Sequence, residues 1–290
     1  MTSSPAAASP SVPQFGRVGV WRSASFLTPE TAAGIERLGY GTVWIGGSPD
    51  ADLGIAEQVL DATERVTVAT GIVNIWKAPA TEVAASFHRL EERHPNRFML
   101  GIGIGHREAQ GEQYQKPYAA LMEYLDVLDA EGVPIDRRVI SALGPQTLRL
   151  SVKRAAGTHP YMTTPAHTRF AREIVGPEAL VAPEQRLVLN ENVTEARATA
   201  REFLARYLSL ANYRRTLESH GLPAADLDNG APDEAVDALV PHGTAAHLAE
   251  AVRGHLDAGA SHVCVQMLPA REDPLDALAA LASELGLPAA

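Results

Sequence analysis

Short apolar runs alternate along the chain with longer segments in which apolar residues recur every three or four positions. The short runs are rich in β-branched residues and end in Gly, Ser or Thr, which is typical of buried strands. The longer segments have helical spacing, as at Leu121, Tyr124, Leu125 and Leu128, and again at Leu248, Val252 and Leu256. Repeated strand–helix units predict a parallel sheet covered by helices.

Eight such units predict an α/β fold of the (β/α)8 TIM barrel type. The predicted strands are residues 17–21, 42–45, 66–72, 98–104, 138–142, 158–162, 185–189 and 262–267. Thr28, which precedes Pro29, and Thr244, which follows Gly243, are predicted helix N-caps. A further helix is predicted near residues 273–285.

The longest connection, residues 194–243, lies between the seventh and eighth predicted strands. It contains a predicted helix, a Gly-Leu-Pro break at 221–223 and an acidic loop at 226–237. Because it is too short for a separate domain, we predict a helical insertion within one barrel domain spanning residues 15–290. Residues 1–14, which consist largely of Ser, Ala and Pro, are predicted to form a disordered tail.

Composition excludes several classes of function. The 290 residues include 35 acidic and 25 basic side chains, a formal charge of -10, which disfavours nucleic acid and anionic membrane surfaces as partners. No apolar run approaches the roughly 20 residues that span a bilayer, and the N-terminus lacks a secretory signal. The single cysteine, Cys264, excludes a disulfide framework and fits a reducing compartment, so we predict a cytoplasmic protein.

Chemistry in such a barrel lies at the C-terminal ends of the strands. The residues there are polar, aromatic and glycine-rich, and they contain no His, Asp and Glu cluster with metal-ligand spacing. No lysine stands at a strand end to form a Schiff base. We therefore predict no metal site, and a pocket for a flat conjugated ligand held largely by backbone groups.

Three glycine-containing segments are candidates for ligand contact. Gly101, Gly103 and Gly105 occupy alternate positions, which leaves room for a ring or, alternatively, for tight packing inside the barrel. Gly144 precedes Pro145 at a predicted helix start, where free N–H groups bind phosphate, although every barrel has eight helix starts. A glycine also ends the third strand, for close backbone approach to a ligand or for a bulge.

Four stretches resemble the luciferase-like flavin and deazaflavin oxidoreductases. They are residues 39–45, 66–72, 96–105 and 142–145, of which Asn-Arg-Phe-Met-Leu-Gly-Ile-Gly at 96–103 is the most specific. The likeness extends over residues 15–268 and is greatest to the branch that uses coenzyme F420. It implies a bacterial luciferase-like (β/α)8 barrel with the cofactor ring at its C-terminal mouth.

The resemblance also implies roles for individual residues. A non-prolyl cis peptide behind the cofactor ring maps to Gly71 and Ile72. The residues expected beside the ring are Ile104, Gly105 and His106, and those expected at the cofactor phosphate are Ala142, Leu143, Gly144, Pro145, Thr147 and Leu148. Many relatives carry an Asp-His pair where this chain has Gly47 and Ser48, so their usual proton donor is missing.

His106 is the predicted replacement acid, because an imidazole titrates near neutral pH. The alternative is a surface or helix-capping histidine. The other nine histidines, among them His242, His247 and His255, are predicted to face solvent. Trp21, Trp76 and Tyr161 are predicted to line the substrate pocket, and Trp44 lines the pocket or belongs to the core. Arg22, Lys77 and Arg107 are candidates to hold the acidic tail of the cofactor.

We therefore predict an F420-dependent oxidoreductase that exchanges a hydride with a small organic substrate. The first alternative is an FMN-dependent luciferase-like monooxygenase. The second is a barrel that binds a cofactor or metabolite without turnover, as a carrier or sensor. The resemblance also implies a homodimer.

Overall fold

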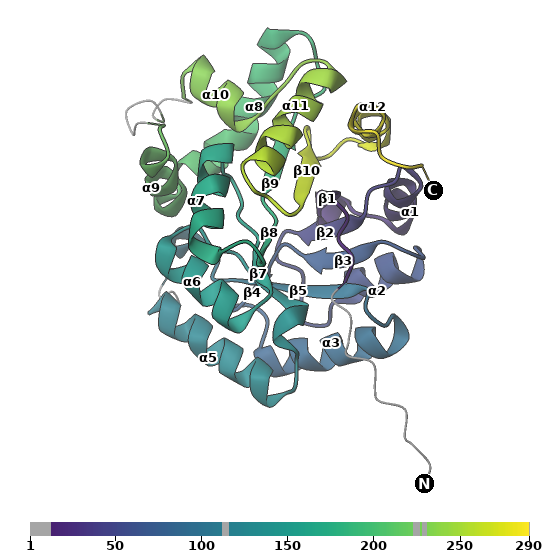
Figure 1. The fold of residues 1–290 in the computed structure, drawn as a ribbon, viewed down its shortest axis with the longest axis vertical. Helices are drawn as coiled ribbons and strands as arrows, with labels where there is room; N and C mark the ends of the chain where they lie inside the picture. Colours follow the sequence, from purple (N-terminus) through teal and green to yellow (C-terminus); the bar gives the residue numbers. More distant parts are fainter. Residues whose placement is uncertain (1–12, 112–115, 223–226, 228–230, 290) are drawn as a thin grey trace.

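The computed structural model describes residues 13–111, 116–222, 227 and 231–289. The first twelve residues of the predicted tail, 1–12, lie outside the described residues, as do Pro223 of the predicted break and Asp226 at the start of the predicted acidic loop. In the remainder, a curled parallel sheet is surrounded by helices (Figure 1).

The strands described pair in parallel, in the order β8-β7-β6-β5-β3-β2-β1-β10-β9, with β4 paired to β5. The strands are β1 (Val18–Ser23), β2 (Thr42–Gly46), β3 (Thr67–Thr70), β4 (Val73–Asn74), β5 (Phe98–Gly103), β6 (Arg138–Ile140), β7 (Gly157–Thr158), β8 (Leu180–Val181), β9 (Glu184–Leu187) and β10 (Val263–Met267).

The helices cover the outside of the sheet, and α8, α9 and α10 gather at one end of it (Figure 1). They are η1 (Ala24–Phe26), α1 (Pro29–Arg37), α2 (Gly54–Asp61), α3 (Ala80–Arg93), α4 (Arg107–Gln110), α5 (Pro117–Ala130), η3 (Ile135–Arg137), α6 (Pro145–Arg154), α7 (Pro165–Val175), α8 (Val193–Leu208), α9 (Ala211–Ser219), α10 (Asp233–Leu239), α11 (Ala245–Asp257) and α12 (Leu275–Leu285). Thr28 and Thr244 cap α1 and α11 through their hydroxyl oxygens, as predicted.

The parallel α/β sheet is confirmed, but the count of eight strands is wrong, because the described residues form ten. The predicted strand 66–72 ends at Thr70, and β4, which lies just beyond the predicted range, pairs with β5. The predicted strand 158–162 shortens to β7, and the two-residue β8 was too short to give a recognisable pattern. A full eight-stranded TIM barrel is therefore not confirmed.

The connection between β9 and β10 is more helical than predicted. Besides α8 it contains α9, and α10 (Asp233–Leu239) occupies part of the predicted acidic loop. Asp233 and Asp237 pair with Arg197 of α8 at N···O separations of 2.5 and 2.6 Å, so the acidic residues dock one helix on another. Ala235, Val236 and Leu239 are buried beneath them, and this apolar spacing is the signal for α10.

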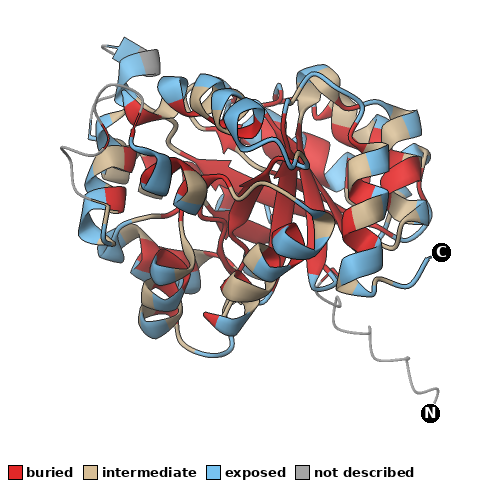
Figure 2. Cartoon of the chain, turned by 90° about the horizontal axis from the view of Figure 1, so that it is seen from above, coloured by how far each residue is buried: buried red, intermediate tan, exposed pale blue. Residues whose placement is uncertain are grey.

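Buried residues concentrate in the sheet and on the inward faces of the helices (Figure 2). One apolar cluster fills the space between the sheet and its helices. A second joins side chains inside the curl of the sheet, such as Trp44 and Met99, to Leu204 of α8 and Val236 of α10. This second cluster anchors the inserted helices to the interior of the sheet.

The Asn-Arg-Phe segment directs the chain into β5. Asn96 adopts a left-handed conformation with φ of 61°, and its side-chain oxygen accepts a hydrogen bond from Arg137 at 3.0 Å. Arg97 donates to the carbonyl of Val66 at 3.2 Å and to the carbonyl and hydroxyl oxygens of Thr63 at 2.8 and 2.7 Å. The segment thus joins the entrances of β3 and β5 and does not contact ligand space directly.

The prediction that nine histidines face solvent is wrong for several of them. His159, His167, His255 and His262 are buried. His255 donates from Nε2 to Gln185 at 2.7 Å and accepts at Nδ1 from the Thr168 hydroxyl at 2.8 Å. Polar partners on the neighbouring elements make this burial possible, and helical spacing alone does not reveal such partners.

Candidate active site

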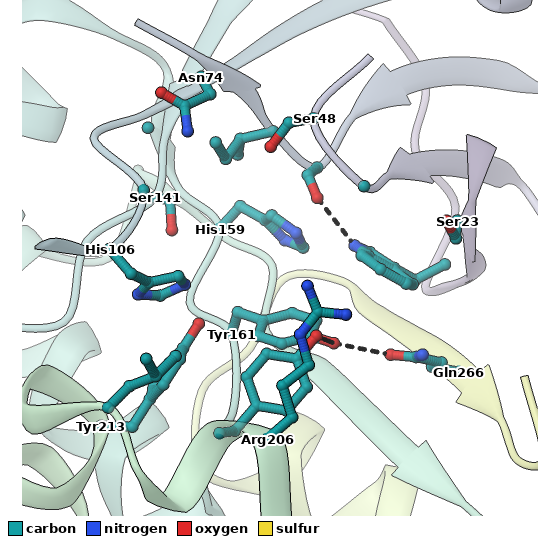
Figure 3. Close-up of a pocket in the computed structure, with 18 of the residues that line it drawn as sticks. Ser23, Ser48, Asn74, His106, Ser141, His159, Tyr161, Arg206, Tyr213 and Gln266 are labelled. Carbon is teal, nitrogen blue, oxygen red and sulfur yellow. Dashed lines mark hydrogen bonds between the residues drawn. The ribbon is translucent and has the colours of Figure 1, made fainter. Parts of the chain in front are cut away.

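A cavity of about 980 Å³ opens at the C-terminal ends of the strands, between the sheet and helices α8 and α9 (Figure 3). Its walls come from nearly every strand end, so residues distant in the sequence meet there. Of the predicted site residues, it is lined by Trp21, Gly71, Ile72, Ile104, Gly105, His106, Ala142, Leu143, Gly144, Thr147 and Tyr161. Pro145, Leu148 and Trp76 are not part of its lining.

Pro145, Leu148 and Trp76 are each next in the chain to a residue that does line the cavity. Pro145 is the first residue of α6, and Leu148 is completely buried under that helix. The Trp76 indole N–H donates to the carbonyl oxygen of Ile104 at 2.7 Å, which supports the segment leading to His106. Trp44 is also completely buried, so it belongs to the core.

Trp21 and Gly71 form one side of the cavity. The indole N–H of Trp21 donates to the carbonyl oxygen of Gly71 at 3.1 Å (Figure 3). The Gly71–Ile72 peptide bond is cis, at the position that the family resemblance indicated. A Cβ atom on Gly71 would lie 2.8 Å from Trp21 Nε1 and 2.9 Å from His159 Nε2, so only glycine leaves these two rings in place.

His159 follows β7 and was not predicted as a site residue. Its Nδ1–H donates to the carbonyl of Ala182 at 2.8 Å, and its ring stacks on Trp44 with centroids 4.2 Å apart. Burial lowers the pKa of His159 to about 4, so the ring is neutral at pH 7. Its Nε2 is a buried acceptor with no partner among the described residues. Tyr161, two positions further along the chain, also lines the cavity. Because side chains two apart in an extended segment point to the same side, the predicted role of Tyr161 could have indicated His159 as well.

His106 precedes α4 and lies against α9. Its ring is 5.1 Å from that of Tyr213, centroid to centroid, and its buried Nδ1 has no hydrogen-bond partner in the described structure. Burial is the main cause that lowers the pKa of His106, and the positive charge of Arg206 lowers it further. A hydrogen bond with Asn212 and the charge of Glu108 act in the opposite direction. His106 therefore lines the cavity and also flanks a helix, the position expected of the alternative helix-capping histidine, although its side chain makes no capping hydrogen bond.

Tyrosine side chains form the wall of the cavity next to His106. The Tyr161 hydroxyl donates to Gln266 Oε1 at 3.0 Å and lies 3.3 Å from the Tyr207 hydroxyl. Ring centroids of Tyr207 and Tyr213 are 5.7 Å apart, and the Arg186 guanidinium lies 5.4 Å from the Tyr161 centroid. The wall therefore offers aromatic faces together with hydroxyl groups to a ligand.

Beneath Tyr161 lies a completely buried ion pair. Glu184 and Arg186 approach to 2.9 Å, and burial raises the pKa of Glu184 to about 7 although the arginine opposes this shift. The pair lies outside the cavity lining, and Arg186 also contacts the Met162 sulfur. It supports the tyrosine wall from behind.

The N-terminus of α6 faces the cavity through Gly144 and Thr147. No side chain caps this helix, and no heavy atom lies within 4 Å of where a Gly144 Cβ would stand. The carbonyl of Leu143 accepts a hydrogen bond from His167 Nε2 at 2.9 Å, which holds the preceding loop. Open space next to the free N–H groups of a helix start suits an anionic group.

The three predicted basic residues differ in their availability. Arg22 is buried and donates to the carbonyl oxygens of Phe26 and Glu272 at 2.6 and 2.9 Å. Arg107 is exposed and lies outside the cavity lining, whereas Lys77 is part of it. Two further groups of lining residues were not among the predicted site residues. One comprises the polar side chains Ser23, Ser48, Asn74, Ser141 and Gln266, and the other the basic side chains Arg206, Arg215 and Arg271.

Within the described residues, no three His, Cys, Asp or Glu side chains come together in a way that would hold a metal ion. No helix in that part of the chain is both long and apolar enough to cross a membrane.

Residues 27–131 match the model of the luciferase-like monooxygenase family, so the resemblance is confirmed for this part of the chain. No curated protein sequence matches the chain. Solved structures similar to it extend the likeness of fold. An F420-dependent secondary alcohol dehydrogenase in complex with an F420-acetone adduct has a TM-score of 0.74 at 14% identity, covering 93% of this chain and 98% of that one.

Two further structures of similar fold belong to enzymes with different activities. A coenzyme F420-dependent tetrahydromethanopterin reductase from Methanopyrus kandleri has a TM-score of 0.68 at 14% identity, covering 93% of this chain and 98% of the reductase. The oxygenating constituent of 3,6-diketocamphane monooxygenase from Pseudomonas putida, in complex with FMN, also has a TM-score of 0.68, at 12% identity, with coverages of 93% and 97%. The chain therefore shares a luciferase-like fold with these structures.

Proposed function

We propose that the protein is an F420-dependent oxidoreductase. One observation carries the proposal: the segments around Gly71, Gly105 and Gly144, which the family resemblance assigned to the cofactor, all line one cavity. Two of the similar structures are described as F420-dependent enzymes. When bound, the deazaflavin would supply hydride transfer at its C5 atom, to or from a small organic substrate.

The cavity fits such a cofactor in size and in chemistry. Its volume of about 980 Å³ lies at the upper end of the range for ligand sites. Gly71, Ile72, Ile104, Gly105 and His106 would contact the ring. The loop and helix start formed by Ala142, Leu143, Gly144, Pro145, Thr147 and Leu148 would hold the phosphate, where the open space beside Gly144 admits an anion.

His106 would act as the acid that exchanges a proton with the substrate. Its Nδ1 is buried and lacks a partner in the described structure, so this atom is available to hold the proton. Trp21 and Tyr161 would exclude water from the reacting face, because both rings are nearly buried at the cavity wall. Of the three basic residues predicted to hold the acidic tail of the cofactor, Lys77 lines the cavity and would take this role.

An FMN-dependent monooxygenase is the second candidate, favoured by the FMN-containing structure of similar fold. Binding of a cofactor or metabolite without turnover is the third. Parallel fluorescence titrations of the purified protein with coenzyme F420 and with FMN test the proposal. Micromolar or tighter F420 binding with weak FMN binding supports it, the reverse preference supports the monooxygenase, and binding of neither contradicts both.

Turnover separates the first candidate from the third. After F420 binding is established, reduced F420 is mixed with a panel of oxidised organic acceptors, and reoxidation is followed by absorbance. Sustained multiple turnover with any acceptor excludes a carrier or sensor. Reoxidation in the absence of acceptor serves as the control for reaction with oxygen.

We further propose that β8 and β9 act as one interrupted strand that closes the sheet into a barrel. The N–H of Ala182 donates to Thr158 at 2.9 Å on one side, and the N–H of Cys264 donates to Pro183 at 3.0 Å on the other. The single barrel domain over residues 15–290, the homodimer and the cytoplasmic location stay predictions. Size-exclusion chromatography with light scattering tests the homodimer.

A further inference from the structure

Arg206 differs from the other arginines of α8 in its lack of an acidic partner. Arg197 pairs with Asp233 and Asp237, and Arg201 pairs with Asp233 at 2.5 Å. Arg206 forms no ion pair with any described residue, and its side chain is exposed. Instead, its guanidinium is directed into the cavity from the α8 side (Figure 3).

The charge of the cavity wall is opposite to that of the whole chain. Among the described lining residues, Lys77, Arg206, Arg215 and Arg271 are basic and Glu202 alone is acidic. The formal charge of the chain is -10, so this positive lining is local. A cavity lined by one sign of charge attracts ligands of the opposite sign.

Aromatic rings surround the part of the cavity that Arg206 enters. Tyr161 lies against Tyr207 and Trp21, with centroid separations of 5.5 and 5.3 Å, and Tyr213 lies 5.7 Å from Tyr207. Flat faces of this kind bind the apolar, planar part of a ligand. A guanidinium beside them binds a carboxylate through two parallel hydrogen bonds.

Arg206 also comes from a different part of the structure than the cofactor-binding segments proposed above. Those segments lie at strand ends and at the start of α6, whereas Arg206, Tyr207 and Tyr213 lie on the inserted helices α8 and α9. The two groups of residues approach the cavity from different elements. One cavity can therefore hold the cofactor on the strand side and the substrate on the α8 side.

We propose that Arg206 binds the carboxylate of a planar, unsaturated or aromatic acid whose body packs on the wall formed by Tyr161, Tyr207 and Tyr213. This assignment of a substrate class rests on the proposed oxidoreductase function. The proposal that Arg206 binds an anion does not rest on that function, because it depends only on residues of the apo-protein.

Binding at Arg206 has a consequence for His106. The groups that face this imidazole are Glu108 beyond it in the chain, Arg206 on α8, and Asn212 and Tyr213 on α9. A carboxylate on Arg206 would neutralise the positive charge that opposes protonation of His106. The pKa of His106 would then rise towards its ordinary value when the anion binds, so substrate binding and proton uptake are coupled.

Benzoate and its uncharged analogue benzamide are the probes for the test, by calorimetry with the full chain without cofactor. The wild type should bind benzoate with a Kd below about 10 mM and benzamide at least tenfold more weakly. Arg206→Gln should weaken benzoate binding at least tenfold and leave benzamide binding unchanged. Arg37→Gln, an exposed position on α1, is the matched control for loss of one positive charge.

Four outcomes would overturn the proposal: no benzoate binding by the wild type, equal binding of benzoate and benzamide, benzoate binding unaffected by Arg206→Gln, or an equal loss in Arg37→Gln. Circular dichroism verifies that each variant is folded. In histidine NMR spectra, benzoate should raise the pKa of His106 in the wild type and leave it unchanged in Arg206→Gln.

A titration with F420 separates this proposal from the proposed function. Arg206→Gln should bind F420 within about threefold of the wild type. A loss of F420 affinity in this variant with benzoate binding retained would assign Arg206 to the cofactor and overturn the inference. The wild type could instead bind benzoate in an Arg206-dependent manner and fail to bind F420. That result would support the anion site and contradict the proposed function.

Discussion

The indole N–H of Trp21 donates to the carbonyl of Gly71 at 3.1 Å, and the ring of Trp21 occupies the space that a side chain at Gly46 would need. Trp21 and Gly46 lie on the paired strands β1 and β2, and the ring of Trp21 lies 5.3 Å from that of Tyr161, centroid to centroid. The cavity side formed by Trp21 and Gly71 therefore depends on the absence of a Cβ atom at a third position.

The first prediction is that Gly46→Ala displaces Trp21, because the new Cβ would overlap its six-membered ring. Such overpacking costs about 1–3 kcal/mol of unfolding free energy, and F420 affinity should fall at least tenfold. Urea denaturation and fluorescence titration measure the two effects. Gly254→Ala on α11 is the control, since its Cβ would meet only Pro165 at an ordinary 3.6 Å. Unchanged F420 binding in folded Gly46→Ala would count against a ring beside Trp21.

The second prediction concerns His106. His106→Ala should lower turnover with F420 by a factor of about 10² or more, with F420 affinity within about threefold of the wild type, because a general acid acts on the reaction more than on binding. Steady-state rates and fluorescence titrations measure these quantities. Equal turnover in the two proteins would remove His106 as the acid.

The pH profile of the wild type gives an independent test of the same residue. Burial holds the pKa of His106 below its ordinary value of 6.5, so the protonated form increases only as the pH falls below that value. If the protonated ring is required, turnover should decrease as pH rises through the pKa, and His106→Ala should lack that limb. If turnover of His106→Ala still decreases with rising pH over the same range, the titrating group is a residue other than His106.

Several strands were predictable because their apolar runs are complete. β1, β2, β5, β9 and β10 overlap the predicted ranges, since each is a parallel strand buried on both faces. β8 was missed because it has two residues and lies between Pro177 and Pro183. β4 was also missed, because its two residues, Val73 and Asn74, follow directly after the end of the predicted strand 66–72 and are too few to give a pattern of their own.

The parts of the candidate site formed by backbone and glycine at the strand ends were predictable from the sequence. The parts formed by side chains of the inserted helices α8 and α9 were less so. Gly71, Gly105 and Gly144 stand at strand ends, so their convergence follows from the fold. Arg206 and Tyr213 lie on α8 and α9, and no rule of periodicity says which helix face will cover the strand ends. His159 was overlooked because its only sequence signal is the alternation with Tyr161.

The third prediction is that acid destabilises the protein between about pH 6.5 and pH 4. Burial lowers the pKa of His159, His167 and His262 to about 4 and that of His255 to about 3, against an ordinary value of 6.5. The unfolded chain binds more protons in this interval, so the free energy of unfolding falls as pH falls, by up to about 1.4 kcal/mol per pH unit for each histidine.

Glu184 opposes this trend, because burial raises its folded pKa to about 7 and its protonation favours the native state as pH falls. Four histidines outweigh one carboxyl group, so we expect a loss of several kcal/mol between pH 7 and pH 5. Urea denaturation at pH 7, 6 and 5 measures it. His262→Gln should reduce the slope by about one proton, while its amide can still accept from Trp44 and donate to Gly16. An unchanged slope in this variant would refute the assignment to His262.

The fourth prediction is that Arg97 contributes to stability rather than to ligand binding. Its guanidinium donates to the carbonyls of Thr63 and Val66 and to the Thr63 hydroxyl, which joins the entrances of β3 and β5 on the side opposite the cavity. Arg97→Ala leaves these acceptors unsatisfied and should lower the unfolding free energy by about 2–4 kcal/mol. Arg97→Lys should recover part of the loss, because an ammonium group can reach only some of the acceptors.

Urea denaturation of both Arg97 variants measures this contribution, with exposed Arg37→Ala as the control for removal of a surface arginine. At a temperature where Arg97→Ala is still folded, its F420 affinity should equal that of the wild type, because Arg97 is not part of the cavity lining. A loss below about 1 kcal/mol would show that the hydrogen bonds are replaced by water at little cost. A selective loss of F420 affinity with stability retained would instead give the Asn-Arg-Phe segment a role in the cofactor site, which its place at the strand entrances argues against.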